Sequence, residues 1–173
     1  MSDKSIRIAL LVEDQYQVLE VWYPYFRLKE EGFVVTIIGT GTKEIYQSKE
    51  GYPVKVDASI KDVKAKDFDG VIIPGGYAPD FLRRYDKVVN FIKRLYVDGR
   101  VVAAICHGGW LLVSAGILKG HTVTCFFAIK DDLIAAGAKY VDREVVVDKN
   151  LVTSRKPDDL PRFVQEIIKL VRT

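Results

Sequence analysis

Four short, continuously apolar runs recur along the chain, and longer amphipathic segments separate them. The runs occupy residues 6–12, 33–39, 69–76 and 101–105. A continuous apolar run of this length is typical of a strand that is covered on both faces. Strands that alternate with helices favour a mostly parallel sheet with helices packed on both sides. The sequence therefore predicts an α/β fold.

The segments between the runs supply the other elements. Helical spacing of apolar residues predicts a helix over 18–32, a single long helix over 79–98 and a closing helix over 157–172. Residues 39–57 are polar and rich in strand-forming residues, which indicates a small hairpin or an excursion at the sheet edge. Short strands are predicted at 121–125, 139–142, 144–148 and 151–154.

Length and composition restrict the class of protein. A chain of 173 residues without a linker, a charge block or an internal repeat predicts one domain over 1–173. A net charge of +3, evenly spread, argues against nucleic acid as a partner. No apolar stretch approaches the roughly 18 residues that a membrane span requires. The first residues run into a strand pattern, unlike a secretory leader, so we expect a cytoplasmic protein.

Two cysteines and two histidines limit the chemistry. Cys106 and Cys125 form no disulfide framework, which fits a reducing compartment. His107 and His121 are too few for a histidine-rich metal site, and no CxxC or HExxH spacing occurs. We therefore expect no metal. His121 lies at the start of a predicted strand and is expected at the surface or at the strand end, and Cys125 is expected to be a buried strand residue without a role.

Three turns follow predicted strands, at 13–20, 74–80 and 106–109. In a parallel sheet, ligand sites gather at the carboxyl ends of the strands. We therefore expect these three turns to meet and to form the functional site.

Cys106 stands where the run 101–105 breaks into "CHGG". A nucleophile at a sharp strand-to-helix turn needs small neighbours two residues away on either side, and here these are Ala104 and Gly108. The following helix end would lower the thiol pKa, and the backbone N–H groups of Gly76 and His107 could form an oxyanion hole. The alternative is a packing cysteine, because free cysteine is among the most buried residue types.

Five stretches in order extend this pattern over about residues 6–170. They are "YPYFRLKEEG", "VIIPGGYAPD", "AAICHGGWLLVSAGILKG", "AIKDDLIAAGA" and "VTSRKPDDLP". The chain resembles the PfpI-type intracellular protease and deglycase family, within the class I glutamine amidotransferase-like superfamily. The resemblance implies a flavodoxin-like three-layer α/β/α sandwich with a nucleophile elbow.

The resemblance also implies roles for individual residues. Cys106 is the implied nucleophile and His107 its base. Asp80, contributed by a neighbouring subunit, would orient His107, and Glu20 would touch the cysteine sulfur. A homo-oligomer, a dimer at least, is therefore implied. Members of the family have been described as peptidases, as glyoxalases that need no cofactor, and as protein deglycases.

The chain departs from the family pattern at four positions. Gly109 stands where relatives commonly have proline, and Gln17 where they often have a second acid. Asp80 is shorter than the usual glutamate, and Phe126 lacks the hydroxyl of a tyrosine in some relatives. The last two changes bear on substrate preference and on peptidase efficiency.

Each implied role has a plainer alternative. His107 could be a capping or interface histidine, because adjacent side chains on a helix do not face each other. Asp80 could cap the helix that begins there, and we favour this role. Glu20 could lie on a solvated helix face, but Pro24 removes the N–H that would bond its carbonyl and makes the backbone irregular there. If Glu20 contacts the Cys106 thiol, the two groups would share a proton.

The function classes follow from these residues. The first is a cysteine-dependent hydrolase that acts on peptides, on small 2-oxoaldehydes or on glycated adducts. The alternative is a stress-response redox sensor or chaperone-like protein in which Cys106 is oxidised and turnover is incidental. A third hypothesis is an oligomeric scaffold without catalytic activity. A glutamine amidotransferase is not expected, because no histidine follows His121.

Overall fold

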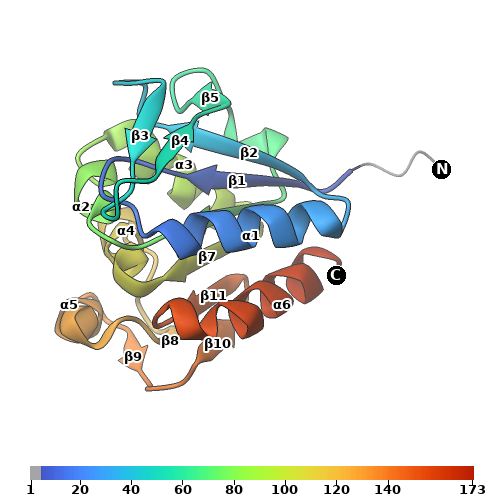
Figure 1. Cartoon of the computed structure of the whole chain (residues 1–173). Coiled ribbons are helices and arrows are strands. Elements are labelled where there is room, and N and C mark those ends of the chain that lie inside the picture. Colours follow the sequence, from blue (N-terminus) through green and yellow to red (C-terminus); the bar gives the residue numbers. More distant parts are fainter. Residues whose placement is uncertain (1–4) are drawn as a thin grey trace.

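A seven-stranded sheet forms the centre of the protein (Figure 1), as seen in a computed structural model that describes residues 5–173. The strand order is β10-β11-β7-β6-β1-β2-β5. All neighbours pair in parallel except β10 and β11, which are antiparallel. The strands are β1 (Arg7–Leu11), β2 (Val34–Gly39), β5 (Ala58–Ser59), β6 (Gly70–Ile73), β7 (Val101–Ile105), β10 (Val145–Asp148) and β11 (Leu151–Ser154).

Helices cover both faces of the sheet. α1 (Val18–Glu30) and α6 (Leu160–Val171) pack against each other in front of the sheet in Figure 1. α3 (Asp86–Val97) and α4 (Gly109–Ala115) pack together behind it. The inner order β2-β1-β6-β7-β11 is that of flavodoxin-like folds. The predicted α/β class and three-layer sandwich are confirmed.

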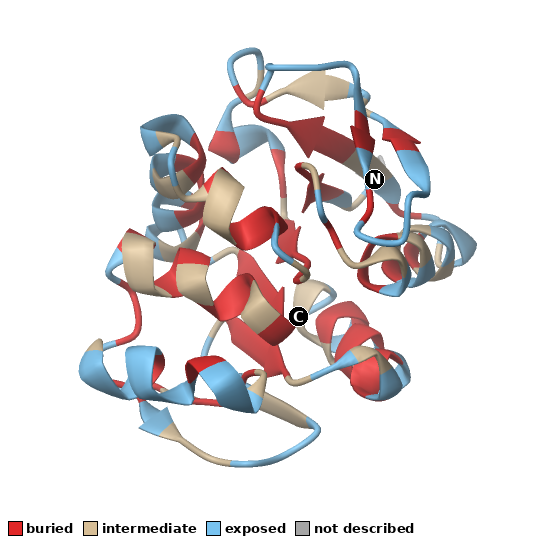
Figure 2. Ribbon diagram, turned by 60° about the vertical axis from the view of Figure 1, so that its left-hand side comes forward, coloured by how far each residue is buried: buried red, intermediate tan, exposed pale blue. Residues whose placement is uncertain are grey.

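The apolar runs form the core, as the pattern predicts. Every residue of β6 and β7 is buried, and Figure 2 shows the sheet in red between helices that are pale blue on their outer sides. Burial of both faces explains why these strands read as continuous apolar runs instead of alternating ones.

The predicted long helix over 79–98 is wrong. The chain forms the short α2 (Ala78–Leu82), turns at 83–85 and begins α3 at Asp86. Tyr85 is extended (φ −109°, ψ 110°), and the N–H groups of Val88 and Val89 both bond its carbonyl. Residues 83–87 include no aliphatic residue, so the helical repeat of aliphatic side chains is interrupted between Leu82 and Val88.

Two small sheets lie outside the central one. β3 (Ile45–Gln47) and β4 (Pro53–Lys55) pair antiparallel, which confirms the predicted hairpin. β8 (Thr122–Val123) and β9 (Lys139–Tyr140) pair in parallel, with α5 (Lys130–Ala135) between them. Within residues 5–173, no helix is long and apolar enough to cross a membrane.

Candidate active site at the end of strand β7

Cys106 follows β7 directly and has a left-handed backbone conformation, with φ of 60°. A residue other than glycine rarely adopts this conformation, which is typical of a side chain held at a functional turn. A Cβ atom on Gly108 would lie 2.5 Å from the carbonyl oxygen of Ile73. The turn therefore requires a residue without a side chain at position 108, as the elbow interpretation predicted.

Glu20 lies in the first turn of α1 and is fully buried. Its Oε2 atom accepts a hydrogen bond of 2.6 Å from the N–H of Gly75. A Cβ atom on Gly75 would lie 2.6 Å from Cys106 Cβ and 2.7 Å from Glu20 Oε2, so this glycine occupies the space between the two side chains. The alternative of a solvated helix face for Glu20 is wrong.

The two buried groups affect each other's ionisation. Burial raises the pKa of Glu20 from its ordinary value of 4.5 to about 7, and the hydrogen bond from the N–H of Gly75 and the nearby charge of Lys49 limit the rise. Burial also raises the pKa of the Cys106 thiol to about 12, and the charge of an ionised Glu20 adds to this rise. Two adjacent negative charges are unfavourable in a buried site, so the pair retains a proton at neutral pH.

The expected lowering of the Cys106 pKa by the following helix is contradicted. The cysteine is buried beside a carboxylate, and a 3-10 turn at residues 106–108 precedes the seven-residue α4. A thiol in this environment ionises only when a nearby group takes its proton.

His107 is placed to take that proton. Its Nδ1 atom lies 3.3 Å from the sulfur of Cys106. Burial and the nearby charge of Lys49 lower the pKa of His107, so the imidazole is neutral near pH 7 and can accept a proton. The ring stacks on Phe126 with centroids 5.1 Å apart and contacts Trp110 edge-on at 5.1 Å. These aromatic contacts fix the ring beside the sulfur.

Backbone N–H groups of His107 and Gly76 lie near the sulfur of Cys106 and lower its pKa against the effect of burial. Their position depends on an interlocked loop. The N–H of Tyr77 donates to the carbonyl of Gln15 at 2.8 Å, and the N–H of Gln17 donates to the carbonyl of Gly75 at 3.2 Å. The turns at 13–20 and 74–80 thus meet at Cys106, as predicted.

Asp80 does not complete the site within one chain. Its carboxylate pairs with Arg84 one turn along, and its side chain is 44% exposed. The expected helix cap is also wrong, because Tyr77 is the N-cap of α2 and no side chain caps that helix. Among the described residues, no hydrogen bond joins Asp80 to His107.

A cavity of about 200 Å³ opens above the sulfur. It is lined by Gln17, Glu20, Lys49, Gly76, Tyr77, Cys106, His107, Phe126, Lys156 and Pro157. The sequence prediction missed Lys49, Tyr77, Lys156 and Pro157. Tyr77 lies inside the stretch "VIIPGGYAPD", and Lys156 and Pro157 lie inside "VTSRKPDDLP", which is the one signal that could have indicated them. Nothing in the local pattern indicates Lys49.

Gln17 has a structural task at this cavity. Its side-chain oxygen accepts from the N–H groups of Leu19 (2.7 Å) and Glu20 (3.1 Å) and so caps α1. The cap fixes the start of the helix that carries Glu20. A neutral amide performs this role without adding a charge to the cavity.

The other cysteine and histidine lie away from this site. Cys125 is buried, as predicted. His121 directly precedes β8, so its expected position at a strand end is confirmed, but it is buried and the surface alternative is wrong. Its Nε2 atom lies 2.7 Å from the hydroxyl of Tyr96, and Nδ1 lies 3.3 Å from a carboxylate oxygen of Asp148. Within residues 5–173, no cluster of three or more His, Cys, Asp or Glu side chains could hold a metal ion.

Curated relatives match the chain over nearly its whole length. Deglycase PfpI of Pyrococcus furiosus is 42% identical over 167 residues, which cover 96% of this chain and all of the relative. YraA of Bacillus subtilis, named as a candidate cysteine protease, is 43% identical and matches 97% of this chain and 99% of its own length.

Solved structures agree with the fold. The DJ-1/ThiJ/PfpI-like part of a two-domain protein from Anabaena variabilis, which also contains a ferritin-like domain, has a TM-score of 0.93 and 38% identity. The match covers 95% of this chain and 48% of that longer one. A ThiJ/PfpI domain protein from Brachyspira murdochii has a TM-score of 0.92 at 23% identity, with 98% of each chain covered, and this likeness concerns the fold alone. The family model described as DJ-1/PfpI matches residues 6–170, so the chain belongs to the DJ-1/PfpI family.

Proposed function

We propose that the protein is a cysteine-dependent hydrolase that uses Cys106 as its nucleophile and acts on 2-oxoaldehydes and their glycated adducts, on peptides, or on both. One observation carries the proposal. The sulfur of Cys106 contacts a neutral imidazole at 3.3 Å and lies beside a buried carboxylic acid of pKa about 7. A thiol of raised pKa can act as a nucleophile only if a nearby base accepts its proton. His107 is that base, and Glu20 is an acid that shares a proton at the same sulfur.

The first step is the same for each substrate class. His107 accepts the thiol proton while the sulfur of Cys106 bonds to a carbonyl carbon, and the carbonyl oxygen becomes an oxyanion. The N–H groups of Gly76 and His107, which lower the pKa of the Cys106 thiol in the free protein, would bind that oxygen as it forms.

With a 2-oxoaldehyde, the adduct is a hemithioacetal. Glu20 removes the hydrogen from the carbon that bears the sulfur and returns a proton to the adjacent carbon, which leaves the thioester of a 2-hydroxy acid. Water then cleaves the thioester and restores the thiol. The balance is one 2-oxoaldehyde and one water to one 2-hydroxy acid, so the reaction requires no cofactor.

With a glycated adduct, loss of the amine or thiol from the carbinol carbon regenerates the 2-oxoaldehyde, which then reacts with Cys106 as above. With a peptide, the scissile C–N bond breaks, the amine leaves with a proton from Glu20 or His107, and water hydrolyses the resulting thioester to the carboxylic acid and the free thiol. The same cavity therefore supports both hydrolytic reactions, and the relatives named deglycase and candidate cysteine protease are consistent with this range.

We also propose a homo-oligomer, a dimer at least, in which Asp80 of a neighbouring subunit orients His107. In one chain no hydrogen bond between described residues fixes the Nε2 side of His107. Tyr77 and Phe127 near His107 are 63% and 69% exposed, and such exposed aromatic residues are typical of an interaction surface. We expect this protein in the cytoplasm, where the thiol of Cys106 remains reduced.

Turnover of methylglyoxal and of a fluorogenic peptide by the wild type and by Cys106→Ser tests the proposal. We expect the serine variant to lose both activities. A serine variant that retains the wild-type rates would refute a role for Cys106 as nucleophile. Stable sulfur oxidation without turnover of either substrate would favour the redox-sensor alternative.

A further inference from the structure

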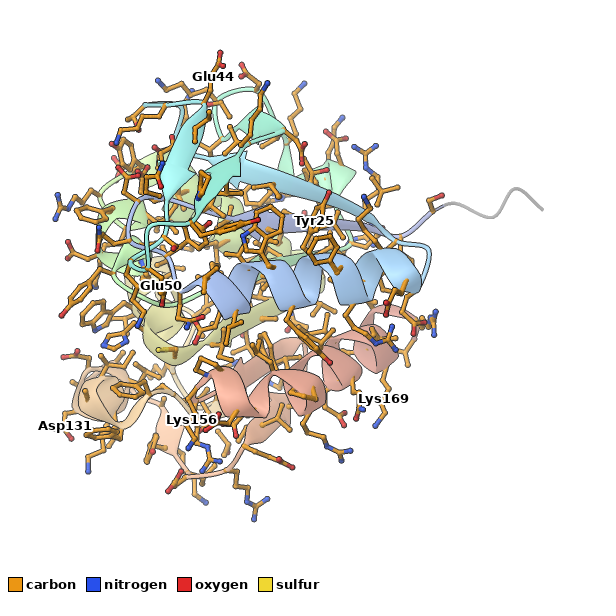
Figure 3. All side chains as sticks on the ribbon, in the orientation of Figure 1. Tyr25, Glu44, Glu50, Asp131, Lys156 and Lys169 are labelled. Carbon is orange, nitrogen blue, oxygen red and sulfur yellow. The ribbon has the colours of Figure 1, made fainter. Side chains whose placement is uncertain are left out.

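Two lysines that the proposed chemistry does not use line the active-site cavity. Lys49 lies on the connection between β3 and β4, and Lys156 lies between β11 and α6. Figure 3 places Glu50, the neighbour of Lys49, and Lys156 at the end of the molecule where the parallel strands have their carboxyl ends. Two segments more than 100 residues apart in sequence thus each bring an ammonium group to the same cavity.

The charge of Lys49 reaches the reacting groups. It lowers the pKa of Glu20, of Cys106 and of His107. One ammonium group therefore favours negative charge on the acid and on the sulfur and disfavours positive charge on the imidazole. A negative group of a bound substrate at this place would be favoured for the same reason.

Neither lysine is held by its present partner. Lys49 lies 3.5 Å from Glu50, and Lys156 lies 3.1 Å from Asp158. All four side chains are at least 38% exposed. Exposed pairs of this kind contribute about 0–1 kcal/mol, so a bound anion can replace either carboxylate.

The balance of charge in the cavity is positive. Among the described residues that line it, Glu20 is the one carboxylic acid, and its pKa of about 7 leaves much of it protonated at neutral pH. Gln17 contributes a neutral amide. Phe126, Tyr77 and Pro157 add apolar surface that suits the carbon part of a small molecule.

We propose that Lys49 and Lys156 bind an anionic group of the substrate, a carboxylate or a phosphate, so that the site prefers carbonyl compounds and adducts that carry a negative charge near the reacting carbon. The inference rests on the proposed function, since it names the substrate class of that site. An ammonium group acts as a point charge, so both anion types share the recognition chemistry.

Alkylation of Cys106 tests this preference without any turnover. Iodoacetate and iodoacetamide are nearly equal in size and differ by one negative charge. Mass spectrometry of the labelled peptide gives the two alkylation rates at Cys106. Both rates depend on the thiolate fraction in the same way, so their ratio does not change when a substitution alters that fraction. We expect Lys49→Met and Lys156→Met each to lower the iodoacetate-to-iodoacetamide ratio by about 3- to 10-fold, which corresponds to removal of one nearby charge.

Lys55→Met is the matched control. Lys55 is an exposed lysine of β4 on the same hairpin as Lys49, and it does not line this cavity. We expect Lys55→Met to keep the wild-type iodoacetate-to-iodoacetamide ratio. We expect Lys49→Arg, which keeps the positive charge, to have most of the wild-type ratio that Lys49→Met loses. The wild-type ratio should fall as salt is added, because salt screens the charges. An equal ratio in the wild type and in the Lys49→Met, Lys156→Met double variant would overturn the inference.

A turnover arm separates this inference from the proposed function. The methylglyoxal adducts of N-acetylcysteine and of N-acetylcysteine amide differ only in the carboxylate. We expect a higher kcat/KM for the charged adduct in the wild type and equal values in the double variant. If neither adduct is turned over but the alkylation ratio depends on the lysines, the proposed function fails and the anion site stands. Competition by inorganic phosphate and by acetate, each at equal ionic strength, shows which anion binds better.

Discussion

The sulfur of Cys106 lies 3.3 Å from Nδ1 of His107, although the two residues are consecutive in the chain. Consecutive side chains on a helix diverge, so this contact depends on the left-handed backbone of Cys106, with φ of 60°. The same conformation directs the sulfur toward Glu20. The nucleophile, its base and its acid therefore meet because of one strained residue.

Glu20 should be required for turnover of 2-oxoaldehydes. Glu20→Gln keeps a side chain of similar shape but removes the titratable proton, and Glu20→Ala removes both. We expect methylglyoxal turnover to fall by roughly two to four orders of magnitude in each variant, the usual scale of positioned acid–base catalysis. Alkylation of Cys106 by iodoacetamide should change much less. Turnover that survives in both variants would mean that His107 or water moves the proton.

Glu20 should also make stability depend on pH. Its pKa is about 7 in the folded protein against an ordinary value of 4.5, so the folded state binds the proton more tightly than the unfolded state. The associated stability is fully present below about pH 4.5 and is lost as pH rises to about 7, on the order of 3 kcal/mol in all. The measurement is the free energy of unfolding of the wild type minus that of Glu20→Gln, by urea denaturation between pH 4.5 and 8. A difference that is constant with pH would contradict the raised pKa.

Gly75→Ala should disable the site without unfolding the protein. The added Cβ would lie 2.9 Å from the sulfur of Cys106 and 2.7 Å from Glu20 Oε2, and both side chains must then move. Because a displacement of about 1 Å can reduce a rate by about 100-fold, we expect a loss of that order in methylglyoxal turnover. Gly109→Ala is the control, since Gly109 has a helical φ of −54° and its added Cβ would meet only side-chain atoms of Ile129 and Leu133. Equal turnover in the two variants would contradict the tight packing of Gly75.

Cys106 should be alkylated before Cys125. Burial raises the pKa of both thiols to about 12, so a difference in thiol pKa does not explain which cysteine reacts first. Cys106 is 8% exposed and has an imidazole 3.3 Å from its sulfur, whereas Cys125 is 1% exposed. Mass spectrometry after limited iodoacetamide treatment should find the label at position 106 first. Faster labelling at 125 would contradict the nucleophile assignment.

Asp80 should act across a subunit boundary. We expect sedimentation to show a dimer or a larger oligomer, and Asp80→Ala to lose activity while it keeps this assembly. Mixed oligomers of Cys106→Ser and Asp80→Ala should then recover activity, because some sites combine an intact Cys106 with an intact Asp80 of the other chain. A fully active monomer, or no recovery in mixtures that exchange subunits, would remove Asp80 from the mechanism. Asp67→Ala, a change at an exposed position between β5 and β6, controls for the loss of a surface charge.

The α/β class, the hairpin at 39–57 and the position of the elbow were predictable from the amino-acid sequence. These features depend on local patterns, namely continuous apolar runs for buried strands and small residues around Cys106 at the end of one of them. The position of Cys106 at the carboxyl end of a central strand follows from the same pattern, because parallel strands end at one edge of the sheet.

Which side chains meet at that edge depends on the packing of elements that are distant in sequence. Glu20 is buried because α1 packs against the turn at Gly75, and a sequence pattern cannot distinguish this from a solvated helix face. Lys49 and Lys156 reach the cavity through loops whose course depends on long-range pairing of the strands. The burial of His121 also arises from contacts distant in sequence, with Tyr96 and Asp148. The spacing of apolar residues in the sequence predicts which side chains are buried. The site depends instead on which polar groups the folded chain brings together.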